Sequence, residues 1–250
     1  MKSTLLVTAA FLIAGMAALP AQQANDGQPP LIRNTYTHLG LVFVTPVAGA
    51  PFSATAVIEN QRTLPDGSVE TLHTINLTGR DSQGRTHGEN RRMMMESFHG
   101  TPPLVDVHIF DPQTRLSTIY ELSTHIARQQ LVPEANKVSG AANPWVKYED
   151  LGTDTIENFD VKGTRRTLTI PPQANATGAE LTVVDEYWYS ETLQANLLTR
   201  HSDPRTGVQT IKLTDIQPEE PPQSFFEVPQ DYKVVDMTPP PRAQVANQTR

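Results

Sequence analysis

Asp106 and His108 are the side chains whose type and spacing best suit metal binding. They stand two residues apart in the run from 104 to 110, and residues two apart on a strand face the same side of a sheet. His87 and Glu89, with the same spacing in an earlier run, could add ligands. The alternative is that these are separate polar side chains on a hydrated sheet face. We expect no metal and no other cofactor. If a metal does bind, Asp106 and His108 are the candidate ligands.

Glu186 is the candidate catalytic residue, because Trp188 follows it in a run rich in aromatic residues. On a strand the two side chains share one face, and a carboxylate beside an aromatic ring suits a sugar site. A glycosidase also needs a second carboxylate about 5–10 Å away. The alternative is that Arg200 or Arg166, on a neighbouring strand, pairs with Glu186 in ordinary cross-strand packing.

The run Met93–Met95, followed by Phe98, could line a cleft for an apolar ligand. Methionine is flexible and polarisable and therefore fills variable apolar spaces, although it packs protein cores equally well. Both interpretations stay open. If the chain holds a ligand, we expect the lining to include apolar side chains from several strands, namely Met94, Phe98, Ile109, Leu168 and Trp188.

Composition and missing motifs exclude several classes of site. The chain of 250 residues has no Cys, which rules out disulfides and cysteine-ligated metals. The sequences GxSxG and HExxH, the phosphate-binding loop and the dinucleotide fingerprint are also missing. A formal net charge of −7 disfavours nucleic-acid binding. We therefore lean towards a protein that is not an enzyme.

The pattern of turns predicts a mainly β fold. Turns rich in Asp, Pro and Gly separate runs rich in β-branched residues, and such turns connect antiparallel strands. The expected strands cover 52–64, 68–80, 85–96, 104–110, 115–121, 164–170, 181–190, 193–202 and 208–216. One helix is expected over 121–131 and a second short helix or turn at 224–226. The similar turns at 111–114 and 203–206 indicate either an internal duplication or one favoured hairpin used twice.

The first residues predict export. Residues 1–21 combine a basic start, an apolar run and small residues, which is the pattern of a cleaved signal peptide. Without Cys the chain cannot be a lipoprotein, so we expect a periplasmic or secreted protein with no stable membrane insertion. A flexible leader is expected over 22–33, one β domain over 34–237 (with two lobes, 34–135 and 145–237, as an alternative), and a disordered Pro-rich tail over 238–250.

The second half of the sequence resembles known exported proteins. The features that carry the resemblance are Gly163-Thr164-Arg165, then Glu186-x-Trp188-x-Ser190, Asp203-Pro204-x-x-Gly207, Leu213-x-x-Ile216, and finally Phe225-Phe226-x-Val228-Pro229-x-x-Tyr232-Lys233-Val234. In this order they resemble uncharacterised exported proteins of the acidobacterial type. Over roughly 150–236 they are also similar in outline to periplasmic lipoprotein-carrier-like domains, the outer-membrane lipoprotein-sorting family.

This resemblance implies a curved antiparallel sheet, or incomplete β-barrel, with one or two short helices and an apolar concave face that binds acyl chains. The sequence therefore leaves three hypotheses open. The first is an exported, non-enzymatic protein that binds a lipid or other apolar ligand. The second is a structural or protein-interaction module of the cell envelope, whose partner could be another envelope protein. The third is a carbohydrate-active hydrolase that uses Glu186.

Overall fold

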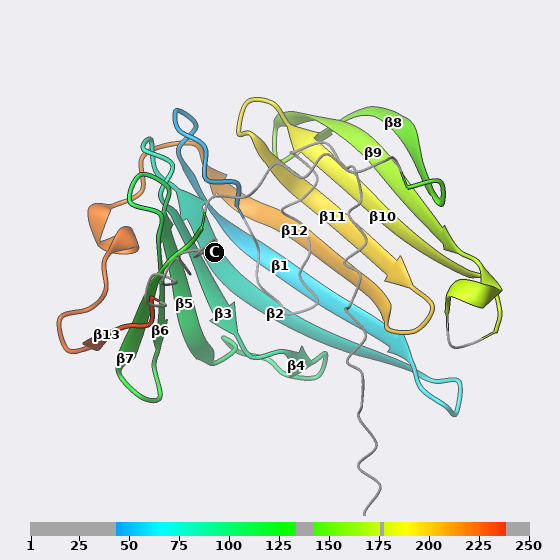
Figure 1. Ribbon diagram of the computed structural model, residues 1–250, viewed down its shortest axis with the longest axis horizontal. Helices are drawn as coiled ribbons and strands as arrows, with labels where there is room; N and C mark the ends of the chain where they lie inside the picture. The colour runs from blue at the N-terminus through cyan, green and yellow to red at the C-terminus, as the bar shows by residue number, and fades with distance from the viewer. Residues whose placement is uncertain (1–43, 134–142, 176–177, 239–250) are drawn as a thin grey trace, which may run out of the picture.

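The computed structural model describes residues 44–133, 143–175 and 178–238, and these form one large, mostly antiparallel sheet that does not close into a barrel (Figure 1). Strands make up 59% of the structure and helices 4%, which confirms the mainly β fold. Its strands are β1 Phe52–Thr63, β2 Val69–Arg80, β3 Thr86–Arg91, β4 Met94–Met95, β5 Leu104–Asp111, β6 Leu116–Glu121, β7 Ile126–Leu131, β8 Val146–Ile156, β9 Phe159–Ile170, β10 Leu181–Ser190, β11 Ala195–Asp203, β12 Gly207–Gln217 and β13 Lys233–Asp236.

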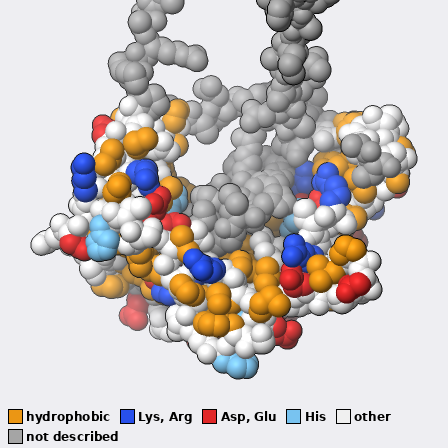
Figure 2. All heavy atoms as spheres, turned by 90° about the horizontal axis from the view of Figure 1, so that it is seen from below, with side chains coloured by type: hydrophobic (Ala, Val, Ile, Leu, Met, Phe, Trp, Pro, Cys, Tyr) orange, Lys and Arg blue, Asp and Glu red, His pale blue; other side chains and the backbone are white. Residues whose placement is uncertain are grey.

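The strand order shows how the two halves of the chain join. It runs β13-β7-β6-β5-β3-β2-β1-β12-β11-β10-β9-β8, with β4 paired to β2 off this path. β1 pairs with β2 on one side and with β12 on the other, both antiparallel. In the space-filling view the described atoms rise on both sides of a lower middle part (Figure 2). One sheet therefore spans both of the lobes expected from the sequence.

The expected helix over 121–131 is wrong, because this segment is a hairpin between β6 and β7. The His125 N–H donates to the Glu121 carbonyl at 3.1 Å, as in one turn of helix, but His125 has a φ of 52°. A left-handed residue reverses the chain into the next strand, and Glu121 then pairs with Ile126. Residues with a positive φ also end the hairpin turns at Arg115, Asn158, Gln194 and Gly207.

The described helices are short. The turn expected at 224–226 is the 3₁₀ helix η2, Gln223–Phe226, and a second one, η1, covers Pro172–Ala174. Among the described residues no helix is long and apolar enough to cross a membrane. The expected signal peptide and leader lie outside the described residues, as does the expected tail apart from its first residue.

Two clusters of buried apolar side chains form the core. The larger lies along β1, β11 and β12 and includes Phe52, Ile58, Leu197 and Leu213, and the smaller joins Val107 and Ile109 of β5 to Phe226 of η2. The segment after β12 thus crosses over β5 before β13 pairs in parallel with β7.

Arg80, at the end of β2, is fully buried and forms hydrogen bonds to two other parts of the chain. Its guanidinium donates to the carbonyls of Ala50 (3.0 and 2.6 Å), Thr45 (2.7 Å), Leu193 (2.5 Å) and Gln194 (3.4 Å). All these partners are carbonyl oxygens. Burial of the guanidinium lowers the pKa of Arg80 to about 10. The arginine therefore joins the segment before β1 to the turn between β10 and β11.

Candidate functional site

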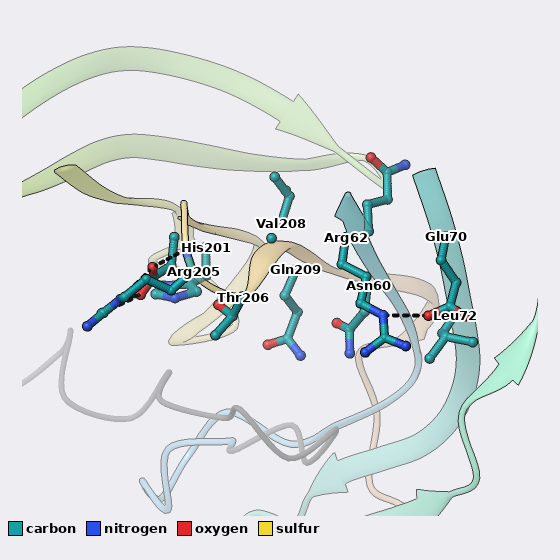
Figure 3. A pocket seen from close by; sticks show the side chains of 12 residues that line it. Asn60, Arg62, Glu70, Leu72, His201, Arg205, Thr206, Val208 and Gln209 are labelled. Carbon is teal, nitrogen blue, oxygen red and sulfur yellow. Dashed lines mark hydrogen bonds and ion pairs between the residues drawn. The ribbon is translucent and has the colours of Figure 1, made fainter. Parts of the chain in front are cut away.

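A cavity of about 640 Å³ opens where β1, β2, β11 and β12 come together at the turn that joins β11 to β12 (Figure 3). The strand register explains which side chains line it. Asn60 of β1 lies opposite both Leu72 of β2 and Gln209 of β12, and Gln209 lies opposite His201 of β11. Directly paired residues share a sheet face, so these four side chains point to one side. The full lining is Asn60, Gln61, Arg62, Glu70, Leu72, His201, Asp203, Arg205, Thr206, Gly207, Val208 and Gln209.

Two arginines of the cavity lining are each held by one carboxylate. Arg62 Nε donates to Glu70 at 2.6 Å, across the pair β1–β2. Arg205 donates from Nε and Nη2 to Asp203 at 2.9 and 2.6 Å, within the turn. The Arg205 hydrogen bond keeps the pKa of Asp203 below its ordinary value, so this carboxylate is ionised at neutral pH. Each pair fixes the position of a guanidinium group, as the dashed lines in Figure 3 mark.

Both arginines retain guanidinium N–H groups that bond to no described residue. Within the described chain Arg62 bonds only through Nε, and Arg205 bonds through Nε and Nη2. Their side chains are 60% and 49% exposed, so these remaining N–H groups can meet a ligand. Asn60, also in the lining, has a buried Oδ1 with no hydrogen-bond partner among the described residues.

His201 is held on the cavity wall by a buried ionic network. Asp185 of β10 accepts from Arg166 of β9 at 2.9 Å, and its other oxygen lies 2.6 Å from His201 Nδ1. The Arg166 and Asp185 side chains are 3% and 5% exposed. Because the charges of Arg166 and Asp185 compensate each other away from water, the network orients the imidazole with little freedom.

The structure does not gather the five predicted ligand residues into one site. Ile109 packs in the smaller core cluster, whereas Trp188 packs against the larger one. Met94 lies on β4 opposite His73, Phe98 lies in the turn after β4, and Leu168 lies on β9 opposite Val183. The cavity lining contains none of the five. Their role in ligand binding stays a prediction.

Glu186 is paired with Arg165, at 2.8 Å, rather than with Arg200 or Arg166. Arg165 lies directly opposite Glu186 on β9, whereas Arg166 lies opposite Asp185 and faces the other side of the sheet. Arg165 also bonds to Glu149 of β8 at 3.1 Å. Glu186 thus belongs to a charged cluster across β8, β9 and β10.

Asp106 and His108 lie on one face of β5, as expected, but each bonds elsewhere. Asp106 accepts from Asn90 at 2.9 Å, and His108 Nε2 lies 2.8 Å from Ser117 Oγ. His87 stacks on the ring of Phe225, with centroids 3.8 Å apart. Among the described residues no group of three or more His, Asp or Glu side chains could hold a metal ion.

Sequence reasoning missed the cavity because its lining comes from polar residues at strand ends. Arg62, Asp203 and Arg205 look like ordinary charged residues beside turns. Only the pairing of β1 with β12, which are far apart in the sequence, brings them together. The Asp203-Pro-x-x-Gly207 turn is the one local signal, and by itself it indicates only a connection between strands.

Comparisons with known proteins do not assign a family. No known protein family and no curated protein matches the chain. A solved structure of an uncharacterised conserved protein from Thermus thermophilus is 13% identical, with a TM-score of 0.42, over 75% of this chain and 90% of that one.

Two further solved structures are more distant. The MucA/MucB complex of Pseudomonas aeruginosa is 12% identical, with a TM-score of 0.39, and the match covers 74% of this chain but only 58% of that one. The LolA superfamily protein NE2245 from Nitrosomonas europaea is 10% identical, with a TM-score of 0.31, over 74% of this chain and 98% of that one. The expected membership of an acidobacterial family has no support from the comparisons.

Proposed function

We propose that this protein is an exported, non-enzymatic binding protein, and that its ligand is a small amphiphile whose anionic group is held in the cavity at the β11–β12 turn. The observation that carries the proposal is the pair of arginines, Arg62 and Arg205, which line one cavity with guanidinium N–H groups that bond to no described residue. Periplasmic or secreted localisation remains part of the proposal and rests on the sequence pattern of residues 1–21.

The chemistry of the lining supports an anionic group. Guanidinium presents N–H donors in a planar fork that matches the oxygens of a carboxylate or phosphate. Glu70 and Asp203 already compensate one positive charge each, so the arginines would offer directed hydrogen bonds rather than a strong net field. A fixed guanidinium loses little freedom when it binds, and pre-organisation of this kind favours affinity.

The remainder of the lining supports an apolar or weakly polar body. Leu72 and Val208 provide apolar surface, and the aliphatic stem of an arginine adds more. A volume of about 640 Å³ lies within the usual range for small-molecule pockets. Glu186, paired with Arg165, is not needed for this function.

Binding of matched amphiphiles by titration calorimetry tests the proposal. Dodecanoate and dodecyl phosphate should bind, and dodecanol, which has the same chain and no charge, should bind at least about tenfold more weakly, since hydrogen bonds to charged groups contribute about 1.5–3 kcal/mol. The comparison of the first two ligands shows whether a carboxylate or a phosphate is preferred.

Variants then locate the anionic group. Arg62→Gln and Arg205→Gln should each weaken dodecanoate binding. Arg200→Gln is the matched control, because Arg200 adjoins His201 on β11 and therefore points to the opposite face. Equal affinity for dodecanol and dodecanoate, or equal losses in all three variants, would refute the proposal.

A further inference from the structure

The sheet ends in a long strand whose outer edge pairs with no other described strand. β8 spans Val146–Ile156, lies last in the strand order and pairs only with β9 within the described part of the chain. Figure 1 shows it at the upper edge of the sheet, far from β13. Such an edge presents backbone N–H and C=O groups to solvent and is a template for another strand.

The register of β8 shows which residues present these groups. The Thr169 N–H donates to the Trp145 carbonyl at 2.9 Å, so the backbone of Trp145 faces β9. In an antiparallel pair alternate residues turn their backbone groups toward the partner. Lys147 and Glu149 therefore bond to β9, and Val146, Tyr148 and Asp150 direct their backbone groups outward.

The side chains at this edge are exposed, and their charges are not balanced. Tyr148 is 41% exposed, and the adjoining Trp145 is 45% exposed. Arg165 bonds to both Glu149 and Glu186, so Glu149 has no counter-ion of its own among the described residues. Lys147 forms no ion pair with any described residue. The edge therefore carries an unbalanced carboxylate and an unpaired ammonium two residues apart.

We propose that β8 is a self-association edge, on which a second copy of this chain pairs antiparallel with its twofold axis at Tyr148. In this arrangement Tyr148 faces Tyr148 of the other copy as a hydrogen-bonded pair. Lys147 of each copy lies opposite Glu149 of the other, at non-hydrogen-bonded positions, where side chains approach most closely.

Among twofold axes at residues 146–150, charge complementarity selects this register. A twofold axis at Lys147 or Glu149 would place like charges opposite each other, and an axis at Asp150 would place two aspartates together. An axis at Val146 would leave both lysines without a carboxylate. The axis at Tyr148 forms two Lys–Glu pairs and gives each Glu149 a cation of its own. The inference does not depend on the cavity or its ligand.

Sedimentation velocity of the full chain, from micromolar to millimolar concentration, tests this proposal. The expected result is a reversible monomer–dimer equilibrium. Lys147→Glu places two carboxylates opposite each other, the new one and Glu149 of the other copy, and should weaken the dimer about tenfold or more. The double variant K147E/E149K restores opposite charges across the interface and should recover the dimer. Lys233→Glu, on the edge strand β13, is the matched control and should leave association unchanged.

Tyr148→Pro supplies an independent test. It removes an outward N–H while leaving the bonds to β9 intact, and proline is tolerated on edge strands. It should abolish the dimer, and far-UV circular dichroism should show an unchanged sheet. A monomer at every concentration, a dimer insensitive to Tyr148→Pro, or a folded double variant that fails to recover association would overturn the proposal.

Discussion

The burial of Arg80 leads to a strong prediction about stability. Arg80→Met keeps an unbranched side chain but removes the Arg80 hydrogen bonds to the carbonyls of Ala50, Leu193 and Gln194. It also removes the Arg80 bond to the Thr45 carbonyl, which still accepts from the Val47 N–H at 2.9 Å. A buried acceptor left without its partner costs about 1–3 kcal/mol, and removing the buried charge returns part of that cost. We therefore expect the free energy of unfolding to fall by about 4 kcal/mol.

Urea unfolding followed by tryptophan fluorescence measures this loss. For a domain of about 200 residues a loss of this size lowers Tm by roughly 8–16 °C, so thermal unfolding provides a second readout. Arg80→Lys should be almost as destabilising, because a lysine ammonium has only three N–H donors and cannot span the carbonyls. Arg200→Met, at an exposed position, is the control and should change stability by less than about 0.5 kcal/mol. A loss of less than about 1 kcal/mol in Arg80→Met would show that the carbonyls do not depend on the arginine.

Three other outcomes follow from the described contacts. Asp185→Ala removes the carboxylate that Arg166 and His201 share and should cost about 3 kcal/mol or more in urea unfolding, whereas Asp160→Ala, at an exposed position, should cost little. Gly163→Ala adds a Cβ that would meet Leu151 Cβ at 2.8 Å and the Trp188 ring at 2.9 Å, and should cost about 1–3 kcal/mol, with a shift in the Trp emission as a local readout. Burial lowers the pKa of His87 and of His108 below 6.5, so the unfolded chain binds protons more readily than the folded chain. The free energy of unfolding should therefore fall as pH drops below about 6.5. His87→Gln should reduce this dependence on pH, and the control His99→Gln, at an exposed position, should not.

Most strands were predictable from local sequence because their turns are marked by residues of strong conformational preference. Pro65-Asp66-Gly67, for example, separates β1 from β2, and Asp203-Pro204 separates β11 from β12. The hairpin of β6 and β7 was not predictable in the same way. Its turn ends on His125 instead of Gly, and the strand that follows, Ile126–Leu131, has only one β-branched residue to mark it as a strand.

The candidate site was less predictable than the fold, because it depends on contacts between distant segments. The pairing of Asn60 with Gln209 brings two lining residues of the cavity together, yet no local sequence pattern indicates this pairing. The apolar residues that the sequence suggests, such as Ile109 and Trp188, stand out by hydrophobicity alone. That property does not distinguish a core position from a ligand contact, and the structure places both residues in or against core clusters.

A crystal structure of the protein soaked with 12-bromododecanoate would locate the proposed ligand, because anomalous scattering shows the bromine and the map then places the carboxylate. We expect one ligand in the cavity at the β11–β12 turn, with its carboxylate hydrogen-bonded to Arg62 or Arg205. An empty cavity at saturating ligand, or a carboxylate bound elsewhere with both arginines untouched, would contradict the proposal.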